Sequence, residues 1–335
     1  MLELGNITQE EYDNAIAKVE DGISFQKGKI ETDGDGIYSY HTDALLLEVI
    51  SDLAQTKKIS KTFATNYLYM ANAKIDSTQN SEIQAKMEKS KYKLQSSNGE
   101  ETSQAAMVII DHKTGQVIGC VGNLGEKKEA RGFNRATQAI RQTGSSSKPL
   151  AVLIPALDKK LITPVSQYRD ELTMFIDYNN EEYEPINYND YLGEITVRRA
   201  VESSQNIPFV KIMEELTASV SIDYLKKMGI STLNEKDENL ALALGGLDKG
   251  ISPLEMAGAY GTIANDGVYI EPTFYTKITA RNGKEVLVSK QAKRRVFSED
   301  VAYVTKKLLT QPVVGNHGTA TYCAIPGMEV AAKTG

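Results

Sequence analysis

A serine stands three residues before a lysine in the segment Arg141-Gln142-Thr143-Gly144-Ser145-Ser146-Ser147-Lys148-Pro149-Leu150. Residues at i and i+3 face the same side of a helix, so an uncharged Lys148 amine could take the proton of Ser145 as its oxygen attacks a carbonyl. A helix that begins near Ser145 leaves its first backbone amides unpaired, and these can face a developing oxyanion. Pro149 has no amide hydrogen and is tolerated in such a first turn. The segment therefore predicts a nucleophile and its base on one helical turn.

Two later segments strengthen this interpretation. A lone Ser-x-x-Lys arises by chance in most proteins of this length. Here it is followed by Ser204-Gln205-Asn206 and then by Lys333-Thr334-Gly335. Serine acyltransferases that carry Ser-x-x-Lys, Ser-x-Asn and Lys-Thr-Gly have the three motifs in this order. The alternatives are a helix cap for Ser204 and Asn206, and an ordinary strand end for the last motif.

Composition narrows the class of protein. The chain has 335 residues, 41% hydrophobic and 24% charged, which predicts a globular fold with one large or two smaller cores. Its net charge of −6 and scattered basic residues give no footprint for nucleic acid. No signal peptide or long apolar span is visible. Cys120 lies in an apolar run that predicts a buried strand thiol, and the three histidines lie far apart in sequence. We expect neither a metal site nor a cofactor.

The first hundred residues read as a linker or small accessory region. An amphipathic helix is predicted within residues 1–20, a second from Asp43 to Leu53, and a strand from Asn66 to Ala73. Residues 76–103 are polar, with Ile83 and Met87 on one helical face.

The remainder predicts an α+β fold. Residues 106–110 and 116–121 are β-rich runs joined by a tight turn, which indicates a hairpin. From residue 145 to about 265 the patterns are mainly helical, and residues 273–290 return to strand-like alternation around a turn at 281–284. This order matches an antiparallel sheet whose strands are separated in sequence by an inserted helical subdomain.

Longer matches surround the motifs. Before the Ser145 motif stand Phe133 to Ala139 and Arg141-Gln142. The Ser204 motif is preceded by Pro185-Ile186-Asn187-Tyr188 and Gly193 to Ala200, and it continues into Ile207-Pro208. After it come Leu242 to Gly246, Ser252 to Ala257 and Ala259-Tyr260, and Gly318-Thr319-Ala320 precedes Lys-Thr-Gly. In these segments the chain resembles the transpeptidase domain of class A penicillin-binding proteins, bacterial cell-wall enzymes that share their fold with serine β-lactamases. The resemblance covers about residues 104–335.

The resemblance implies a domain order and a location. Residues 1–20 resemble the tail of the glycosyltransferase domain that precedes the transpeptidase in these bifunctional proteins. Residues 21–103 would be the linker or accessory region, and residues 104–335 a transpeptidase domain that stops at the Lys-Thr-Gly motif. We expect the membrane anchor to belong to the parent protein, outside this sequence, at the extracytoplasmic face of a bacterial membrane.

The resemblance also implies a role for each motif residue. Ser145 would be the nucleophile and Lys148 its base, while Ser204 would relay a proton to the leaving amine. Asn206 would hold the substrate amide and help to position Lys148. The last motif, Lys333-Thr334-Gly335, would bind the terminal carboxylate of a D-alanyl-D-alanine stem peptide or of a β-lactam. One oxyanion donor would be the backbone amide of Ser145.

Three departures from the family bear on these expectations. In the family, the strand of the Lys-Thr-Gly motif continues, and two further strands and a helix complete the sheet. As written the sheet lacks central strands, so we expect them to exist in a second polypeptide or beyond the given sequence. Ser147 stands where the family often has an aromatic residue, and Ala332 where it commonly has glycine.

Other functions remain open at this stage. A serine β-lactamase needs a second base, and Glu235-Lys236-Asp237-Glu238-Asn239 does not reproduce the Glu-x-x-Leu-Asn of those enzymes. A D-alanyl-D-alanine carboxypeptidase would use water as the acceptor. A non-catalytic scaffold would bind stem peptides or β-lactams without turning them over. Tyr183, Tyr188 and Tyr191 would line a substrate groove or serve only in packing.

Overall fold

The computed structural model describes residues 8–20, 36–89, 104–178 and 180–335. They belong to two compact units, Met1–Ile37 and Tyr38–Gly335. In the first unit, α1 (Gln9–Glu20) confirms the predicted N-terminal helix. Thr8 and Glu11 cap it reciprocally, because the Thr8 Oγ1 atom accepts from the Glu11 amide and the Glu11 carboxylate accepts from the Thr8 amide.

The second unit opens with helices that the local sequence caps. Ser39 accepts a hydrogen bond from the Thr42 amide at the start of α2 (Tyr40–Lys57), which contains the predicted helix from Asp43 to Leu53. Ser60 does the same for Phe63 at the start of α3 (Lys61–Met70). Strand β1 (Lys74–Ser77) and helix α4 (Ser81–Lys89) follow, and α4 carries Ile83 and Met87 as predicted.

The predicted strand from Asn66 to Ala73 is wrong, since residues 66–70 form the second half of α3 and the strand begins at Lys74. The aromatic residues of this stretch favour strands, but their burial follows a helical period. Ala64 is fully buried, and Tyr67 and Leu68 pack against the same core as α2. The Ser60 cap and this packing outweigh the local strand preference.

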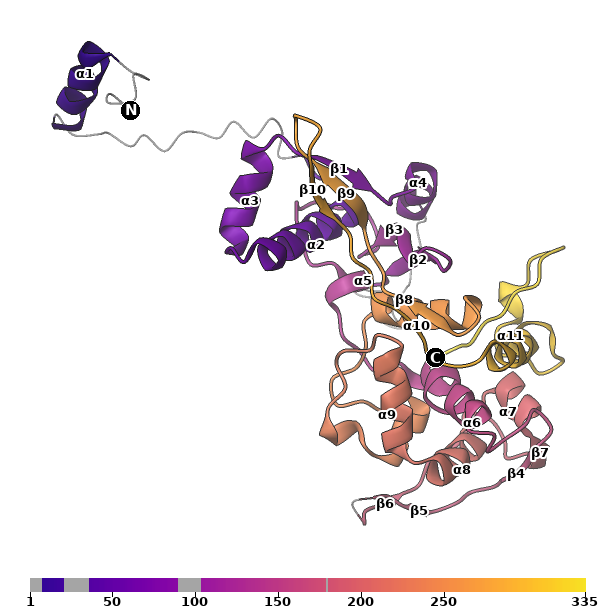
Figure 1. The fold of residues 1–335 in the computed structure, drawn as a ribbon. Coiled ribbons are helices and arrows are strands. Elements are labelled where there is room, and N and C mark those ends of the chain that lie inside the picture. Colours follow the sequence, from indigo (N-terminus) through magenta and orange to yellow (C-terminus); the bar gives the residue numbers. More distant parts are fainter. Residues whose placement is uncertain (1–7, 21–35, 90–103, 179) are drawn as a thin grey trace. The chain divides into compact units, whose positions relative to one another are not determined.

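The smaller of the two hydrophobic cores of this unit joins helices α2 and α3 to the predicted hairpin. Strands β2 (Met107–Asp111) and β3 (Gln116–Val121) pair antiparallel, which confirms the hairpin. Strand β9 (Tyr275–Thr279) lies between β1 and β10 (Glu285–Val288) in an antiparallel sheet (Figure 1). Cys120 on β3 is fully buried, as predicted, and burial raises the pKa of its thiol to about 11. Residues 38–89 therefore form one compact unit with residues 104–335.

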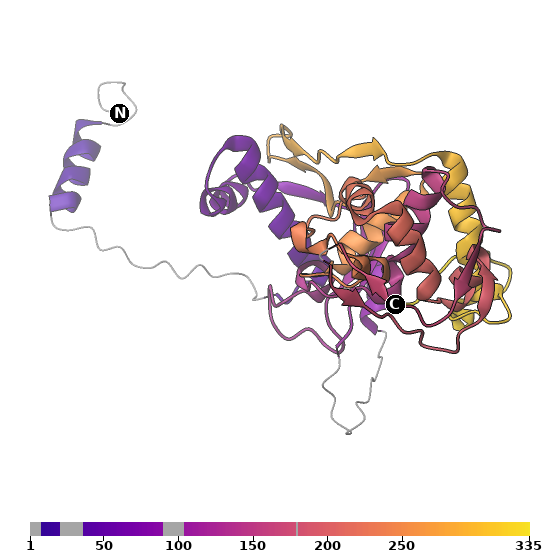
Figure 2. The same cartoon turned by 90° about the horizontal axis from the view of Figure 1, so that it is seen from below.

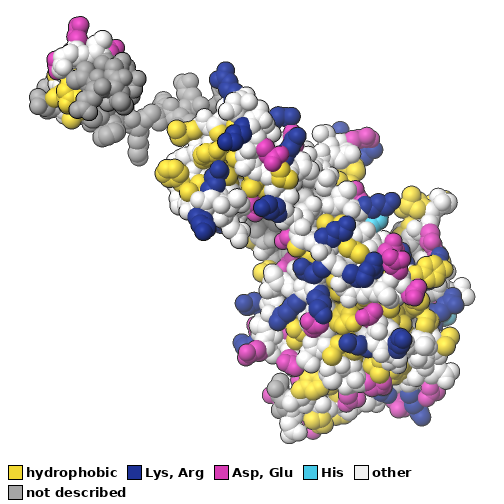
Figure 3. Space-filling view, in the orientation of Figure 1, with side chains coloured by type: hydrophobic (Ala, Val, Ile, Leu, Met, Phe, Trp, Pro, Cys, Tyr) yellow, Lys and Arg dark blue, Asp and Glu magenta, His cyan; other side chains and the backbone are white. Residues whose placement is uncertain are grey.

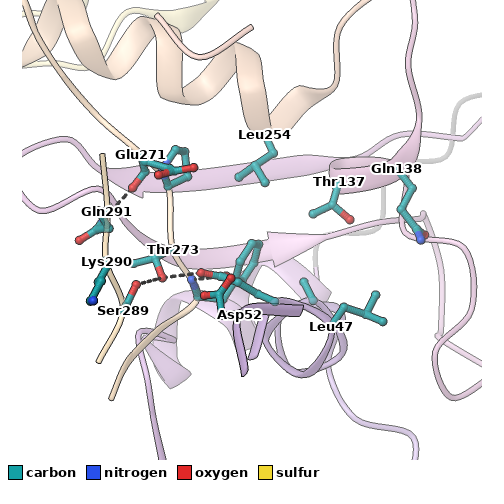
Figure 4. A pocket seen from close by; sticks show the side chains of 14 residues that line it. Leu47, Asp52, Thr137, Gln138, Leu254, Glu271, Thr273, Ser289, Lys290 and Gln291 are labelled. Atoms are coloured by element: carbon teal, nitrogen blue, oxygen red, sulfur yellow. Dashed lines mark hydrogen bonds between the residues drawn. The ribbon is translucent and has the colours of Figure 1, made fainter. Parts of the chain in front are cut away.

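A cavity of about 400 Å³ lies in this part of the unit (Figure 4). Its walls include Leu47 and Asp52 of α2, Leu254, and the segment from Glu271 to Phe274. Thr273 links the walls, because its hydroxyl donates to the Glu48 carboxylate at 2.6 Å.

The larger core belongs to the helical block that separates β3 from β9 in sequence. Its centre is the fully buried run from Leu150 to Ala156 together with the buried face of α8. The elements of the block are α5 (Arg135–Gln138), η1 (Gly144–Ser147), η2 (Pro149–Leu153), α6 (Ile154–Asp158), β4 (Gln167–Asp170), β5 (Phe175–Ile176), β6 (Glu182–Tyr183), β7 (Gly193–Thr196), α7 (Val197–Ser203), α8 (Ile207–Leu216), α9 (Ala218–Lys227), η3 (Glu235–Asp237), η4 (Leu240–Leu244) and α10 (Pro253–Ala264).

The last elements close the unit. Strand β8 (Val268–Ile270) pairs with β11 (Lys293–Arg295), and α11 (Glu299–Val314) packs along α6, α7 and α10 at the edge of the block (Figures 1 and 2). A short turn, η5 (Thr321–Cys323), precedes the C-terminal segment. Helices and antiparallel strands thus confirm the α+β class. Basic and acidic side chains intermingle over the face seen in Figure 3.

Candidate active site

The turn that carries Ser145 is a 3-10 turn, η1, and not the start of a regular α-helix. The Lys148 amide donates to the Ser145 carbonyl, and Pro149 has no amide hydrogen with which to make the α-helical bond to the same carbonyl. The chain continues through a π-helical segment, η2, and becomes α-helical at Ile154. In a 3-10 turn residues i and i+3 lie above one another, so Ser145 and Lys148 share a side as predicted.

Neighbouring segments hold this turn closely. Gly245 has a positive φ of +79°, and a Cβ atom there would lie 2.3 Å from the Gly144 carbonyl oxygen. The Tyr260 hydroxyl donates to the Ser146 carbonyl at 2.6 Å. Ser146 itself donates to the Thr143 carbonyl, whereas the partly exposed Ser145 hydroxyl has no hydrogen bond among the residues that the structure describes. The turn thus leaves one of its serines available for chemistry.

Lys148 is completely buried, and its amine donates to three oxygens. These are the Ser204 carbonyl at 2.7 Å, the Gln205 carbonyl at 2.9 Å and Asn206 Oδ1 at 2.6 Å. Burial lowers the pKa of Lys148 well below its usual value, and the nearby positive charge of Lys333 lowers it further. The surroundings of Lys148 therefore favour the neutral form of this amine more than water does.

The Ser204 motif begins where α7 ends. Thr196 caps the helix at its start, and Ser204 closes it in the left-handed conformation with φ +58°. A serine pays strain to adopt this φ, and here the consecutive carbonyls of residues 204 and 205 both accept from Lys148. Asn206 precedes α8, and its side chain makes no cap hydrogen bond, so the helix-cap alternative does not describe its role.

The C-terminal motif lies beside the other two. The Lys333 amine donates to the Ser204 hydroxyl at 2.7 Å, and burial lowers the pKa of Lys333 to about 8. The Thr334 and Thr319 hydroxyls are 2.9 Å apart. Gly335 lies against the serine turn, since a Cβ atom there would be 2.7 Å from the Thr143 carbonyl oxygen. Residues 329–335 form no strand in the structure.

All the predicted site residues therefore meet in one place, although Ser145 and Lys148 do not hydrogen-bond to each other in this structure. Sequence reasoning missed Asn187, which binds the Asn206 backbone, and Asp170, which binds Asn187. Asn187 Oδ1 accepts a hydrogen bond from the backbone amide of Asn206 at 2.8 Å, and the Asp170 carboxylate accepts one from the Asn187 side-chain nitrogen at 2.8 Å. Asn187 lay in a segment already singled out by resemblance, whereas no pattern marked Asp170.

The part of the chain that the structure describes contains neither a group of metal ligands nor a helix that could span a membrane. Within residues 8–20, 36–89, 104–178 and 180–335, no group of three or more His, Cys, Asp or Glu side chains could hold a metal ion. Over the same ranges, no helix combines the length and apolar character that a membrane crossing requires.

Known proteins resemble this chain in sequence and fold. The family described as "Penicillin binding protein transpeptidase domain" matches residues 105–335. Penicillin-binding protein 1F of Bacillus subtilis is 37% identical over 76% of this chain and 34% of its own length. Penicillin-binding protein 1A of Clostridium botulinum is 34% identical over 100% of this chain and 42% of its own length. The chain thus spans less than half the length of these relatives.

Solved structures share the fold at lower identity. The penicillin-binding protein PonA1 from Mycobacterium tuberculosis has a TM-score of 0.65 at 22% identity, covering 80% of this chain and 69% of that one. The D,D-transpeptidase domain of a peptidoglycan glycosyltransferase from Eggerthella lenta has a TM-score of 0.60 at 22% identity, covering 78% of this chain and 70% of that one. Together with the family match over residues 105–335, these findings place the chain in the penicillin-binding protein transpeptidase family.

Proposed function

We propose that this chain is a serine D,D-transpeptidase domain that cross-links peptidoglycan stem peptides through an acyl-enzyme on Ser145. The observation that carries the proposal is the buried Lys148 amine, whose pKa is lowered and which is held one turn from an available serine hydroxyl. A base needs a pKa near the working pH, and a lysine reaches it only through burial or a neighbouring cation. Lys148 has both.

The proposed acylation begins with neutral Lys148. A neutral amine keeps two N–H donors and gains a lone pair, so it can satisfy only two of the three oxygens around it and can accept from Ser145. The Ser145 oxygen bonds to the penultimate D-alanine carbonyl carbon while its proton passes to Lys148. The C–N bond to the terminal D-alanine then breaks, and that amine leaves with a proton relayed through Ser204.

The second half reaction would reverse these proton transfers. The amine of a neighbouring stem peptide attacks the ester carbonyl and gives up one proton, a new peptide bond forms, and Ser145 recovers its hydroxyl hydrogen. Lys333 would bind the carboxylate of the donor peptide or of a β-lactam, with Thr334 beside it. A β-lactam would acylate the same serine, but its ring-opened amine stays attached and blocks the acceptor position.

The parent protein is proposed on the same basis. The relatives are more than twice as long as the aligned segment, so we propose a bifunctional chain in which residues 1–20 end a glycosyltransferase domain and residues 21–103 are a linker or accessory region before the transpeptidase. We further propose that a membrane anchor holds it at the extracytoplasmic face of the bacterial membrane, and that strands in a continuing or second polypeptide complete the sheet.

The β-lactamase alternative is the weaker one on structural grounds. It requires a carboxylate that activates water beside the acyl-enzyme. Within the described ranges, no Asp or Glu hydrogen-bonds to Ser145 or Lys148. Glu235 and Glu238 are exposed, and Asp237 is engaged in capping its own turn through the Asn234 amide. Carboxypeptidase activity differs only in the acceptor, and a scaffold would keep the site without acylation.

Intact mass spectrometry tests the proposal. We expect one stable adduct when the protein is incubated with benzylpenicillin, and no adduct in Ser145→Ala. Ser146→Ala is the matched control, because it removes a neighbouring hydroxyl that bonds to the Thr143 carbonyl, and it should keep the adduct. An adduct that persists in Ser145→Ala, or an unmodified wild type with intact drug, would overturn the assignment. Rapid consumption of the drug without an adduct would favour the β-lactamase. With a D-alanyl-D-alanine peptide as the substrate in place of the drug, release of D-alanine without incorporation of an acceptor amine would favour the carboxypeptidase.

A further inference from the structure

A buried carboxylate lies behind the candidate site without a cation bonded to it. Asp170, the last residue of β4, is 0% exposed. Its two oxygens accept from the Asn187 side chain at 2.8 Å and from the Leu192 amide at 2.9 Å. Among the described residues no Lys or Arg forms an ion pair with it. Burial of an unpaired charge costs desolvation free energy. Asp170 therefore lowers the stability of the fold at a place where packing alone would favour a neutral side chain.

Hydrogen bonds connect this carboxylate to the lysine of the site. Asn187 donates to Asp170 through Nδ2, which leaves its Oδ1 to accept from the Asn206 amide at 2.8 Å. The Asn206 side chain is oriented in turn, because its Nδ2 donates to the Ile186 carbonyl at 2.6 Å and its Oδ1 accepts from Lys148 at 2.6 Å.

The loop from residue 184 to 192 contains Asn187, the link between Asp170 and Asn206, and further contacts fix this loop in place. Gln205 donates to the Asp190 carbonyl at 3.1 Å, next to the Leu192 amide that binds Asp170. Strand β7 then pairs with β4 in a register that sets Gly193 opposite Asp170. The loop from residue 184 to 192 is thus tied to β4 at its end and to residues 205 and 206 along its length.

Two charged groups act on Lys148 from the surrounding elements. Lys333, from the C-terminal segment, opposes the positive charge of the protonated amine, and Asp170, from β4, favours it. The aromatic ring of Phe209 lies 5.2 Å from the amine on a third side. When Lys148 takes a proton, Asp170 therefore supplies the compensating negative charge.

We infer that Asp170, acting through Asn187, is a positioning residue of this site that holds Asn206 against Lys148 and balances the charge which the lysine gains from Ser145. The inference rests on the proposed acyl-transfer function. It assigns Asp170 no contact with the substrate and no proton transfer of its own. Its effect is on the position of the Asn206 backbone, from which the side chain reaches Lys148, and on the equilibrium between the two protonation states of the Lys148 amine.

The test is the acylation rate constant of the full chain with a fluorescent penicillin, measured across pH. In Asp170→Asn the rate should fall at least about tenfold, because the chain of hydrogen bonds from Asp170 to Lys148 loses an acceptor and the proton loses a stabilising charge. In the plot of the rate constant against pH, the decline on the acid side (the acid limb) should also move to lower pH. The reason is that Lys148 without the negative charge of Asp170 becomes neutral at lower pH. A variant that merely loosened the fold would lower the rate at every pH and leave the limb in place.

Asp43→Asn is the matched control. Asp43 is also buried, and it accepts from one side-chain nitrogen, Lys127 Nζ, and from one backbone amide, that of Arg131. It belongs to α2 and has no hydrogen bond to the site. The control should lose stability but keep both the acylation rate and the position of the acid limb.

A second variant separates orientation from charge. Asn187→Ala keeps the Asp170 carboxylate and removes its link to Asn206, so the rate should fall while the acid limb moves less than in Asp170→Asn. A folded Asp170→Asn with the wild-type rate and limb overturns the inference. If that variant does not fold, a wild-type rate in Asn187→Ala overturns it instead. Failure of the proposed function looks different, because the wild type itself would then not be labelled at Ser145.

Discussion

The Lys333 amine donates a 2.7 Å hydrogen bond to the Ser204 hydroxyl, which joins two motifs separated by 129 residues of sequence. This contact leaves the Ser204 hydrogen free to be donated elsewhere, because the hydroxyl oxygen is the acceptor. It also brings a second cation toward Lys148, where it lowers the pKa of the buried amine. One hydrogen bond therefore aligns a candidate proton relay and tunes the candidate base.

Replacing the buried amine should abolish acylation. Lys148→Met keeps most of the side-chain volume but removes the proton acceptor, so the acylation rate should fall at least about a hundredfold. It also leaves three oxygens without their donor and should lower the melting temperature. Lys211→Met is the control, because Lys211 likewise donates to a backbone carbonyl, that of Arg169. Equal acylation in both variants would exclude Lys148 as the base.

Acylation should decline on the alkaline side near pH 8. Burial lowers the pKa of Lys333 to about 8, and a carboxylate ligand binds the charged form. As the pH rises through this value the ammonium is lost, and the rate constant at low drug concentration should fall with it. Lys333→Arg stays charged and should abolish this limb, whereas Lys307→Arg, an exposed lysine paired with Glu329, should retain it. A limb that survives in Lys333→Arg would assign it to another group.

Gly245→Ala should disturb the serine turn. The added Cβ atom would lie 2.3 Å from the Gly144 carbonyl oxygen and 2.6 Å from the Gly144 nitrogen, at a φ of +79°. Gly283 has a similar φ of +81° but nothing within 4 Å of such an atom, so Gly283→Ala isolates the backbone strain. We expect Gly283→Ala to cost about 1 kcal/mol with unchanged acylation, and Gly245→Ala to cost more and to slow acylation. Thermal melting and penicillin labelling of both variants check this.

The second unit should lose stability as the pH rises toward 7. Burial, with a smaller contribution from the nearby Asp52 and Glu271 carboxylates, raises the pKa of Glu48 from 4.5 to about 7. The folded state then binds the Glu48 proton more tightly than the unfolded chain does. The stabilising contribution of this proton to the free energy of unfolding is therefore complete below about pH 4.5 and disappears as the pH rises through about 7. Its upper limit is about 3 kcal/mol.

Melting temperatures at pH 5 and pH 8 measure this effect. The difference between the two should be smaller in Glu48→Gln than in the wild type, because the amide cannot titrate. Glu235→Gln, at an exposed position, should keep the wild-type difference. The same difference in all three proteins would show that Glu48 does not govern it.

Much of the fold follows from local sequence patterns. The hairpin at 107–121, the helix α2 and the helical character of residues 145 to 265 are predicted, because alternation and helical periodicity involve residues that are neighbours in the chain. The strand predicted at residues 66–73 is wrong because contacts with residues distant in the chain decide the structure there. Aromatic residues there favour a strand locally, and only the core beneath Ala64 and the Ser60 cap decide for a helix.

The sequence by itself determined the three motifs, their order and the placement of Ser145 and Lys148 on one side of a single turn, because a separation of three residues is sufficient for that placement. Only the tertiary structure decided that Lys148 is buried among the oxygens of residues 204–206, that Lys333 reaches Ser204, and that Asp170 stands behind Asn206. Burial and electrostatic coupling depend on which distant segments pack together, and no local pattern encodes the charge that a buried amine will meet.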